Sequence, residues 1–186
     1  MVAEDQYLEA YSEIANIGTG NAATALASFL HSRVMLDPPA AYRVDLQTAC
    51  DLLIDGNRNT SVVLLECSGE LDGVITLFLD DPAPYLAALG APEEFAVDAI
   101  AEIGNIFAAK FLDAIGSMLG IEGHHAPPAT ASGDRRAIMQ TVLALASQTD
   151  SYTLVRCWLR LEDGRSPAEL VYFPGPSSLE HVGSLV

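Results

Sequence analysis

Two long segments of the chain carry apolar residues at the spacing of an amphipathic helix. Residues 12–30 and residues 101–119 both repeat an apolar side chain every three or four positions. In the first helix the apolar face is expected to be Tyr7, Tyr11, Ile14, Gly18, Ala22, Ala25 and Phe29. In the second it is expected to be Ile100, Ile103, Phe107, Phe111, Ala114 and Met118. We therefore predict two helices that each bury one face.

Shorter elements follow each long helix in a similar order. After the first helix, the pattern predicts a short strand, a short helix and two strands, at 41–44, 46–53, 61–67 and 73–79. After the second, it predicts a short helix and two strands, at 136–147, 152–161 and 168–174. Acidic turns at 70–73 and 162–165 mark a hairpin in each set. A further short helix that begins at Asp80 leads from the first set into the second.

The two sets are copies of one unit. A shift of 89 residues places Glu13 on Glu102, Asn16 on Asn105, Ile17 on Ile106 and Pro39 on Pro128. Strands linked by hairpins favour an antiparallel sheet, on which helices pack. We therefore predict an α+β fold, in which a tandem duplication of helix, strand, short helix, strand and strand units forms one antiparallel sheet of about six strands with the two long helices on one face. Residues 1–186 are expected to be a single domain of two pseudo-symmetric halves, about 1–90 and 91–186.

Composition and charge narrow the functional classes. Half of the residues are hydrophobic, which allows a sizeable core, but no apolar run reaches the roughly 18 residues that a membrane helix needs. The acidic beginning of the sequence argues against a secretory signal, so a soluble cytoplasmic protein with no membrane partner is expected. The net charge of −16 argues against nucleic acid as a partner, because phosphate binding needs a basic footprint.

The strong acidity has two possible explanations. It could match a basic surface on a partner, or it could be a solubilising surface suited to high salt, which screens the self-repulsion. The second explanation is favoured, because the chain holds 25 acidic residues and Lys110 is its only lysine. We predict that the fold is most stable in high salt.

The cysteines and histidines do not form a metal-binding pattern. Cys50, Cys67 and Cys157 show no CxxC spacing and are expected to be buried thiols. His124 and His125 are expected to lie in a loop rich in glycine and proline, which offers too few ligands for a metal. No cofactor or metal site of the protein's own is therefore expected.

The helix faces opposite the apolar stripes carry a repeated Glu-x-x-Asn pair. These faces are expected to hold Glu9, Glu13, Asn16 and Gly20 in the first helix, and Asp98, Glu102, Asn105 and Ala109 in the second. Residues i and i+3 are neighbours on a helix surface, so each pair presents a carboxylate beside an amide. A solvated helix face would explain one such pair. Because asparagine is a poor helix former, its occurrence twice at the same mid-helix position indicates a function.

The first helix also contains two glycines, each of which costs a helix roughly 1 kcal/mol relative to alanine. Gly18 falls on the apolar stripe, where close helix packing explains it. Gly20 falls one turn beyond Asn16 on the exposed face, where a side chain would hold an incoming surface away. A phosphate cradle is disfavoured, because no strand precedes the glycines and neither GK[ST] nor GxGxxG is present.

The second copy of the motif resembles a family signature. The spacing Asp98-x3-Glu102-x2-Asn105-x22-Pro128 is similar to that of the CheC/CheX/FliY family of chemotaxis phosphatases. Two motifs in one chain are typical of the CheC branch, whereas CheX has one, and FliY carries an additional flagellar-switch domain that this sequence does not contain. The resemblance covers essentially the whole chain.

The first copy of the motif fits the same signature from its glutamate onward. It reads Glu13-x2-Asn16-x22-Pro39, and the stretch "NIGTGNAATAL", which begins at Asn16, resembles the first-site sequence of the CheC branch. Glu9 stands where the family usually has Asp or Ser, so the acid is kept on a longer side chain.

The resemblance implies a function and partners. The function is dephosphorylation of the aspartyl phosphate on a CheY-type response regulator, which supplies the Mg²⁺, and the further partner is the receptor deamidase CheD. The catalytic residues would be Glu13, Asn16, Glu102 and Asn105, and the partner-binding residues would be Glu9, Gly20, Asp98 and Ala109. Low lysine content and strong acidity would suit a salt-loving archaeal version of such a protein.

The residue types of the motif agree with this chemistry. The motif contains no nucleophile, which is acceptable if the substrate protein already holds the phosphoryl group, because phosphoryl transfer needs mainly positioning and charge stabilisation. An amide can accept from and donate to one water, so the asparagines are expected to orient the attacking water. The glutamates are expected to pair with a cation on the regulator.

Two other functions stay open at this point. A non-catalytic adaptor would bind CheD or the regulator and alter its activity without hydrolysis, and it would tolerate substitution of asparagine by alanine. A flagellar switch component is disfavoured, because the extra domain is missing from the sequence.

Overall fold

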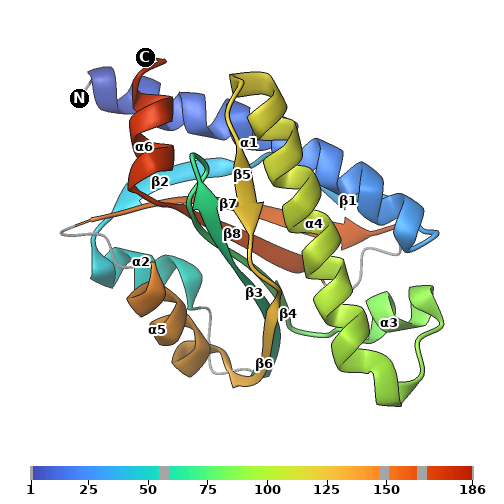
Figure 1. Cartoon of the computed structure of the whole chain (residues 1–186). Coiled ribbons are helices and arrows are strands. Elements are labelled where there is room, and N and C mark those ends of the chain that lie inside the picture. The colour runs from blue at the N-terminus through green and yellow to red at the C-terminus, as the bar shows by residue number, and fades with distance from the viewer. Residues whose placement is uncertain (1, 55–58, 147–150, 163–166, 186) are drawn as a thin grey trace.

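An antiparallel sheet runs through the middle of the protein, with helices on both of its faces (Figure 1). The computed structural model describes residues 2–54, 59–146, 151–162 and 167–185. Within these residues the strands are β1 (Val34–Leu36), β2 (Ala40–Val44), β3 (Asn59–Gly69), β4 (Gly73–Leu79), β5 (Gly123–His125), β6 (Ala129–Asp134), β7 (Tyr152–Leu161) and β8 (Ala168–Pro174). The helices are α1 (Val2–Phe29), α2 (Leu46–Leu53), α3 (Ala83–Leu89), the short 3₁₀-helix η1 (Glu93–Phe95), α4 (Ala96–Leu119), α5 (Arg135–Leu145) and α6 (Pro176–Gly183).

The sheet is built by an exchange of strands between the two halves of the chain. The short strands β1 and β2 pair with β7 of the second half, and the short strands β5 and β6 pair with β3 of the first half. The hairpin strands β4 and β8 pair with each other at the centre. There Thr76 lies opposite Val171, and its hydroxyl donates to the Val171 carbonyl oxygen at 3.1 Å. The predicted α+β fold with one antiparallel sheet is confirmed.

The two long helices pack side by side on one face of the sheet, as predicted. They meet where Gly18 of α1 lies against the side chains of Phe111 and Ile115 of α4. The inner face of α1 is buried at Tyr11, Ile14, Ala15, Gly18, Thr19, Ala22, Ala23 and Leu26. Helices α3 and α6 add Tyr85 and Val182 to the same core.

The buried face of α4 is rotated slightly from the predicted one. Met118 was expected on the apolar stripe, but 41% of it is exposed. Ala108, Leu112 and Ile115 are buried instead, because α4 packs on both α1 and β3 and therefore buries a wider face than one stripe. Gly104 marks the contact with the sheet, since a Cβ at this position would lie 2.5 Å from the Val63 side chain.

Helices α2 and α5 cover the opposite face of the sheet with a second core. Each begins at an aspartate that caps it: the Asp45 carboxylate accepts from the Thr48 amide at 2.7 Å, and the Asp134 carboxylate accepts from the Ala137 amide at 3.0 Å. The shift of 89 residues relates these two caps as well. The short helices therefore repeat in detail, down to the group that starts them.

A buried ionic network attaches α5 to the sheet. The Arg135 guanidinium donates to the Leu53 carbonyl oxygen at 3.1 Å and to the Asp80 carboxylate at 3.2 Å, and it also pairs with Glu169. Arg156 pairs with the same Glu169 carboxylate. Burial raises the pKa of Glu169, although both arginines act to lower it. The network therefore joins Glu169 of β8 to α5 and, through the Leu53 carbonyl, to the end of α2.

Most of the predicted short elements are present, and three strands were not located from the sequence. The first hairpin turn, at 70–73, is confirmed by the pairing of β3 with β4. Residues 163–166 of the second turn lie outside the described residues, but the flanking strands β7 and β8 pair as a hairpin requires. Strands β1, β5 and β6 bring the described sheet to eight strands, whereas about six were expected.

Candidate functional site

The first Glu-x-x-Asn pair lies on the outer side of α1. Glu13 and Asn16 are exposed, while Ile14 and Ala15 between them are buried in the core. Among the described residues, the Asn16 side chain has no hydrogen-bond partner, so its amide is open to solvent or to a bound molecule. The pair is held on a rigid element, because the helix is fixed by its buried face.

The helix surface on the C-terminal side of Asn16 carries a glycine, Gly20, in place of a side chain. A Cβ built on Gly20 would have no other atom within 4 Å, so this glycine faces open space, as predicted. Gly18 differs, because a Cβ there would lie 2.7 Å from the Phe111 ring. The packing explanation for Gly18 is therefore confirmed, and Gly20 needs another one.

The second pair lies on α4 and is partly organised. Glu102 is exposed and Asn105 is half-buried. The Asn105 Nδ2 donates a hydrogen bond to Glu102 Oε2 at 3.3 Å. An amide that donates in this way keeps its oxygen free to accept from another donor. The carboxylate therefore helps to set the direction of the amide in this copy.

A hollow of about 410 Å³ opens beside the second pair. It is lined by Asp98, Ala101, Glu102, Asn105, His125, Pro127 and Pro128. The repeated proline of the motif thus lies beside the pair in space as well as at a fixed distance in sequence. None of the lining residues comes from α1, so each helix presents its own pair and the two pairs do not share this hollow.

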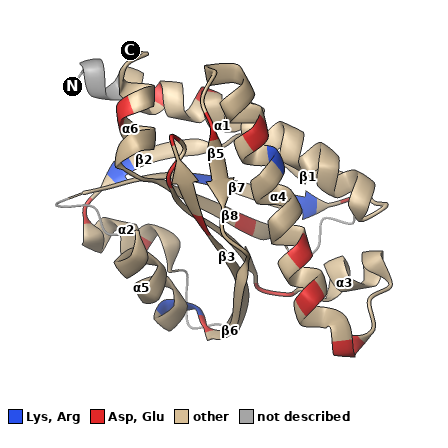
Figure 2. Ribbon diagram, viewed as in Figure 1, with Lys and Arg blue, Asp and Glu red and all other residues tan. Residues whose placement is uncertain are grey.

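The residues predicted to bind a partner lie around the pairs. Glu9 and Asp98 are exposed one turn before Glu13 and Glu102, and the half-buried Ala109 lies one turn after Asn105. Figure 2 shows acidic positions along α4 and few basic ones in the same view. The nearest cation on this helix, Lys110, is engaged with Asp113 at 3.1 Å. The second pair therefore offers carboxylates that a cation from outside can approach.

The segments after the motif helices are attached differently in the two copies. In the first, the Ser12 hydroxyl oxygen accepts from the Ala41 amide at 3.0 Å and so ties α1 to β2. In the second, the corresponding position is Ala101, which has no such group and lines the hollow. Pro39 is buried, whereas Pro128 is half-buried. The second site is consequently the more open of the two beside its proline.

For one residue of the second site, the structure differs from the position predicted from the sequence. His125 was expected in a loop, but it belongs to β5 and pairs with Cys67 of β3. The strand directs this histidine to the hollow beside Glu102 and Asn105. The pairing with β3 joins residues far apart in sequence, and three residues are too few to show an alternating pattern, so the sequence carried no sign of it.

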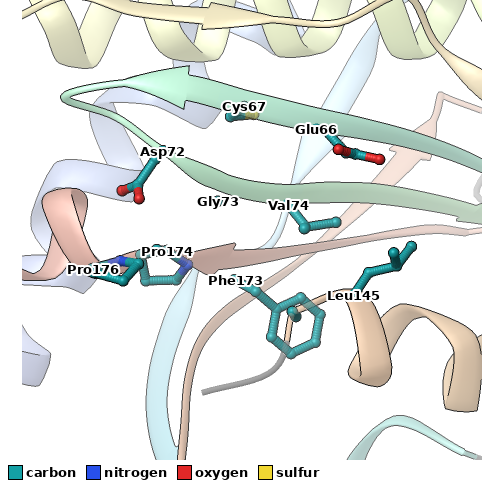
Figure 3. Close-up of a pocket in the computed structure, with 11 residues that line it drawn as sticks. Glu66, Cys67, Asp72, Gly73, Val74, Leu145, Phe173, Pro174 and Pro176 are labelled. Atoms are coloured by element: carbon teal, nitrogen blue, oxygen red, sulfur yellow. The ribbon is translucent and has the colours of Figure 1, made fainter. Parts of the chain in front are cut away.

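A different hollow, of about 240 Å³, lies at the β3–β4 turn and the end of β8 (Figure 3). One of its two carboxylates is engaged within the fold, because the Asp72 carboxylate accepts from the Ser178 amide at 2.8 Å. Burial raises the pKa of the Cys67 thiol to about 12, so this sulfur is a weak nucleophile. The hollow contains neither Glu-x-x-Asn pair.

Two other structural features are absent from the described residues. No helix within them is long and apolar enough to cross a membrane. No three side chains of His, Cys, Asp or Glu gather there in the way that a metal site would need.

Comparisons with known proteins agree with this architecture. The CheC-like family model matches residues 10–43, the segment that contains the first motif and its proline. The curated "CheY-P phosphatase CheC" of Bacillus subtilis (strain 168) is 20% identical over 168 residues, which are 82% of this chain and 78% of that protein.

Solved structures show the same fold. The crystal structure of FliY from Thermotoga maritima matches with a TM-score of 0.77 at 18% identity, over 96% of this chain and 94% of that one. The CheX of the CheX–CheY–BeF3–Mg complex from Borrelia burgdorferi matches with a TM-score of 0.54 at 17% identity, over 85% and 96% of the two chains. The protein thus has the α+β fold of the FliY and CheX structures. The resemblance to the CheC/CheX/FliY family that its two motifs predict is confirmed.

Proposed function

We propose that this protein dephosphorylates the aspartyl phosphate of a CheY-type response regulator in chemotaxis. The observation that carries the proposal is the repeated pair of an outward-facing glutamate and asparagine, held at equivalent places on two rigid helices. The similarity to a curated CheY-P phosphatase and to a CheX solved with CheY supports the choice of substrate. The protein would work in the cytoplasm, where its substrate would be found.

The asparagines would act on water. An aspartyl phosphate is already labile, and its hydrolysis needs chiefly a water held in line with the phosphorus. Asn16 and Asn105 can each accept from and donate to such a water once the helix lies over the regulator's site. The half-buried, hydrogen-bonded Asn105 is better ordered before binding, so we expect the second site to carry at least as much activity as the first.

The glutamates would position the partner. A loose transition state gains little from early deprotonation of water, so a general base is not required. Glu13 and Glu102 are exposed and can pair with a cation near the regulator's phosphoryl group, which fixes the asparagine at the reacting centre. The Mg²⁺ and the phosphoryl group would both come with the regulator. Glu9 and Asp98 would extend the contact by one helical turn.

The experiment compares rates of dephosphorylation for Asn16→Ala, Asn105→Ala and the double variant. Each single substitution should remove most of the activity of its own site, and the double variant should return the regulator to its spontaneous rate. Circular dichroism should show an intact fold, because neither asparagine belongs to the buried helix face. A folded double variant with the wild-type rate would contradict the proposal.

The alternative is an adaptor that binds CheD or the regulator without hydrolysis. It shares the binding surface and differs in the role of the amide, because an adaptor needs no oriented water. The same asparagine variants separate the two functions: an adaptor would retain its effect on CheD or on the regulator in the double variant. Glu13→Ala and Glu102→Ala would weaken the encounter with the regulator under either function.

A further inference from the structure

We infer that His125 is a docking residue of the second site, where it accepts a hydrogen bond from a cationic side chain of the response regulator. The inference rests on the proposed function, and it makes the two sites chemically unequal. It assigns the contact to the Nε2 atom of the imidazole.

The hydrogen bonding of the ring decides which nitrogen is available. The His125 Nδ1 lies 3.0 Å from the Ala126 carbonyl oxygen. A carbonyl oxygen can only accept, so Nδ1 is the nitrogen that donates here, and Nε2 is the nitrogen left to accept from another group. Nε2 makes no hydrogen bond to any residue within the described ranges. The strand pairing of β5 with β3 fixes the backbone that carries the ring.

The surroundings of the ring define the kind of group that it would bind. His125 lines the same hollow as Asp98 and Glu102, whose carboxylates also accept hydrogen bonds. A lysine ammonium group has three N–H donors and no acceptor, so three acceptors around one hollow suit it. The imidazole would therefore supplement the carboxylate that the proposed function assigns to docking.

The first site lacks this group. The shift of 89 residues places Leu36 of β1 at the position of His125, and Leu36 packs partly against the core. A leucine cannot accept a hydrogen bond, so the first site would offer the cation only its glutamates. The chain thus contains a natural control, in which the same strand position carries no acceptor.

Binding of a CheY-type regulator, activated with beryllium fluoride and Mg²⁺, tests the inference. Glu13→Arg leaves only the second site for docking, and Glu102→Arg leaves only the first. In the Glu13→Arg protein, His125→Leu should weaken binding about tenfold, the loss of one hydrogen bond to a charged group. His125→Gln, which keeps an acceptor, should restore most of the affinity. In the Glu102→Arg protein, His125→Leu should change nothing.

Hydrolysis by the same proteins provides a second readout. His125→Leu should raise KM in the Glu13→Arg protein and leave kcat nearly unchanged, because the residue docks the partner and does not touch the water. Unchanged affinity, or an equal loss in both backgrounds, would overturn the inference. A wild-type protein that binds the regulator without hydrolysing its phosphate would contradict the proposed function, while the binding test of His125 would still decide this inference.

Discussion

Gly18 of α1 lies so close to Phe111 of α4 that a Cβ on Gly18 would come within 2.7 Å of the ring. Gly20, two residues further on, is half-buried, and a Cβ there would meet no atom within 4 Å apart from the backbone of its own helix. The two glycines of one short motif therefore have different roles. Gly18 permits the close contact between the long helices, and Gly20 leaves the helix surface beside Asn16 without a side chain.

The first prediction concerns stability at these glycines. Gly18→Ala should destabilise the fold by about 1–3 kcal/mol, because an overpacked core must shift. Gly20→Ala should stabilise it by about 0.5–1 kcal/mol, because alanine restricts the unfolded chain and favours the helix. Urea unfolding followed by circular dichroism measures both. The prediction is wrong if Gly18→Ala is as stabilising as Gly20→Ala.

The second prediction concerns activity at Gly20, and it rests on the proposed function. Gly20→Leu should block the first site alone, because the larger side chain would hold the regulator's surface away from Asn16. The effect should therefore be large in an Asn105→Ala background, where only the first site remains. In an Asn16→Ala background the same substitution should leave the rate of dephosphorylation unchanged, and a loss there would point to a general disturbance.

The third prediction concerns the ends of the long helices. His31 follows α1 with φ of 48°, and Gly120 follows α4 with φ of 72°, so both occupy the left-handed region. Only glycine adopts this region without a penalty, which is about 1–2 kcal/mol for other residues. His31→Gly should raise the melting temperature, and Gly120→Ala should lower it by several degrees. The shift of 89 residues places His31 on Gly120, so each variant serves as the control for the other.

The fourth prediction concerns the cysteines. Burial raises the pKa of both Cys67 and Cys157 to about 12, so at pH 8 almost none of either thiol is ionised. Iodoacetamide should therefore label the native protein at the half-buried Cys50 at most, and should label all three cysteines in urea. Mass spectrometry of digested protein would locate the label. Rapid native labelling of Cys157 would contradict the burial described for it.

The fifth prediction concerns salt. A net charge of −16 repels itself across the surface, and salt screens such repulsion. The melting temperature should therefore rise between dilute buffer and molar KCl. Variants that replace exposed acids with neutral residues of the same shape carry less negative charge, and their melting temperature should rise less with salt. An unchanged melting temperature would leave the acidity without this explanation.

The amphipathic and strand patterns were sufficient for most of the fold. Residues 46–53, 73–79, 152–161 and 168–174 were predicted with the bounds that the structure gives to α2, β4, β7 and β8. Strands β1 and β5 have three residues each, too few for a visible period. Strand β6 consists of small and polar residues with low strand propensity, and its place is set by pairing with β3.

The sequence predicted only those parts of the candidate site whose residues lie close together along the chain. The Glu-x-x-Asn pairs each lie within one helical turn, so the helix period alone placed them on the outer face. The contribution of His125 depends on β5 reaching β3 and bringing the ring beside α4. The paired caps Asp45 and Asp134 could have been found, because the shift of 89 residues already aligns them before two short helices.

The exchange of strands between the halves has a consequence for how the protein could be divided. Each half gives its two short strands to the long strand of the other, so a chain cut between α3 and η1 would leave both fragments with unpaired sheet edges. Such fragments would resemble the subunits of an obligate dimer and would meet only as often as their concentration allows. The linker after α3 replaces that bimolecular encounter with a high effective concentration. The protein is in this sense a covalently fused dimer, whose assembly does not depend on how much of it the cell makes.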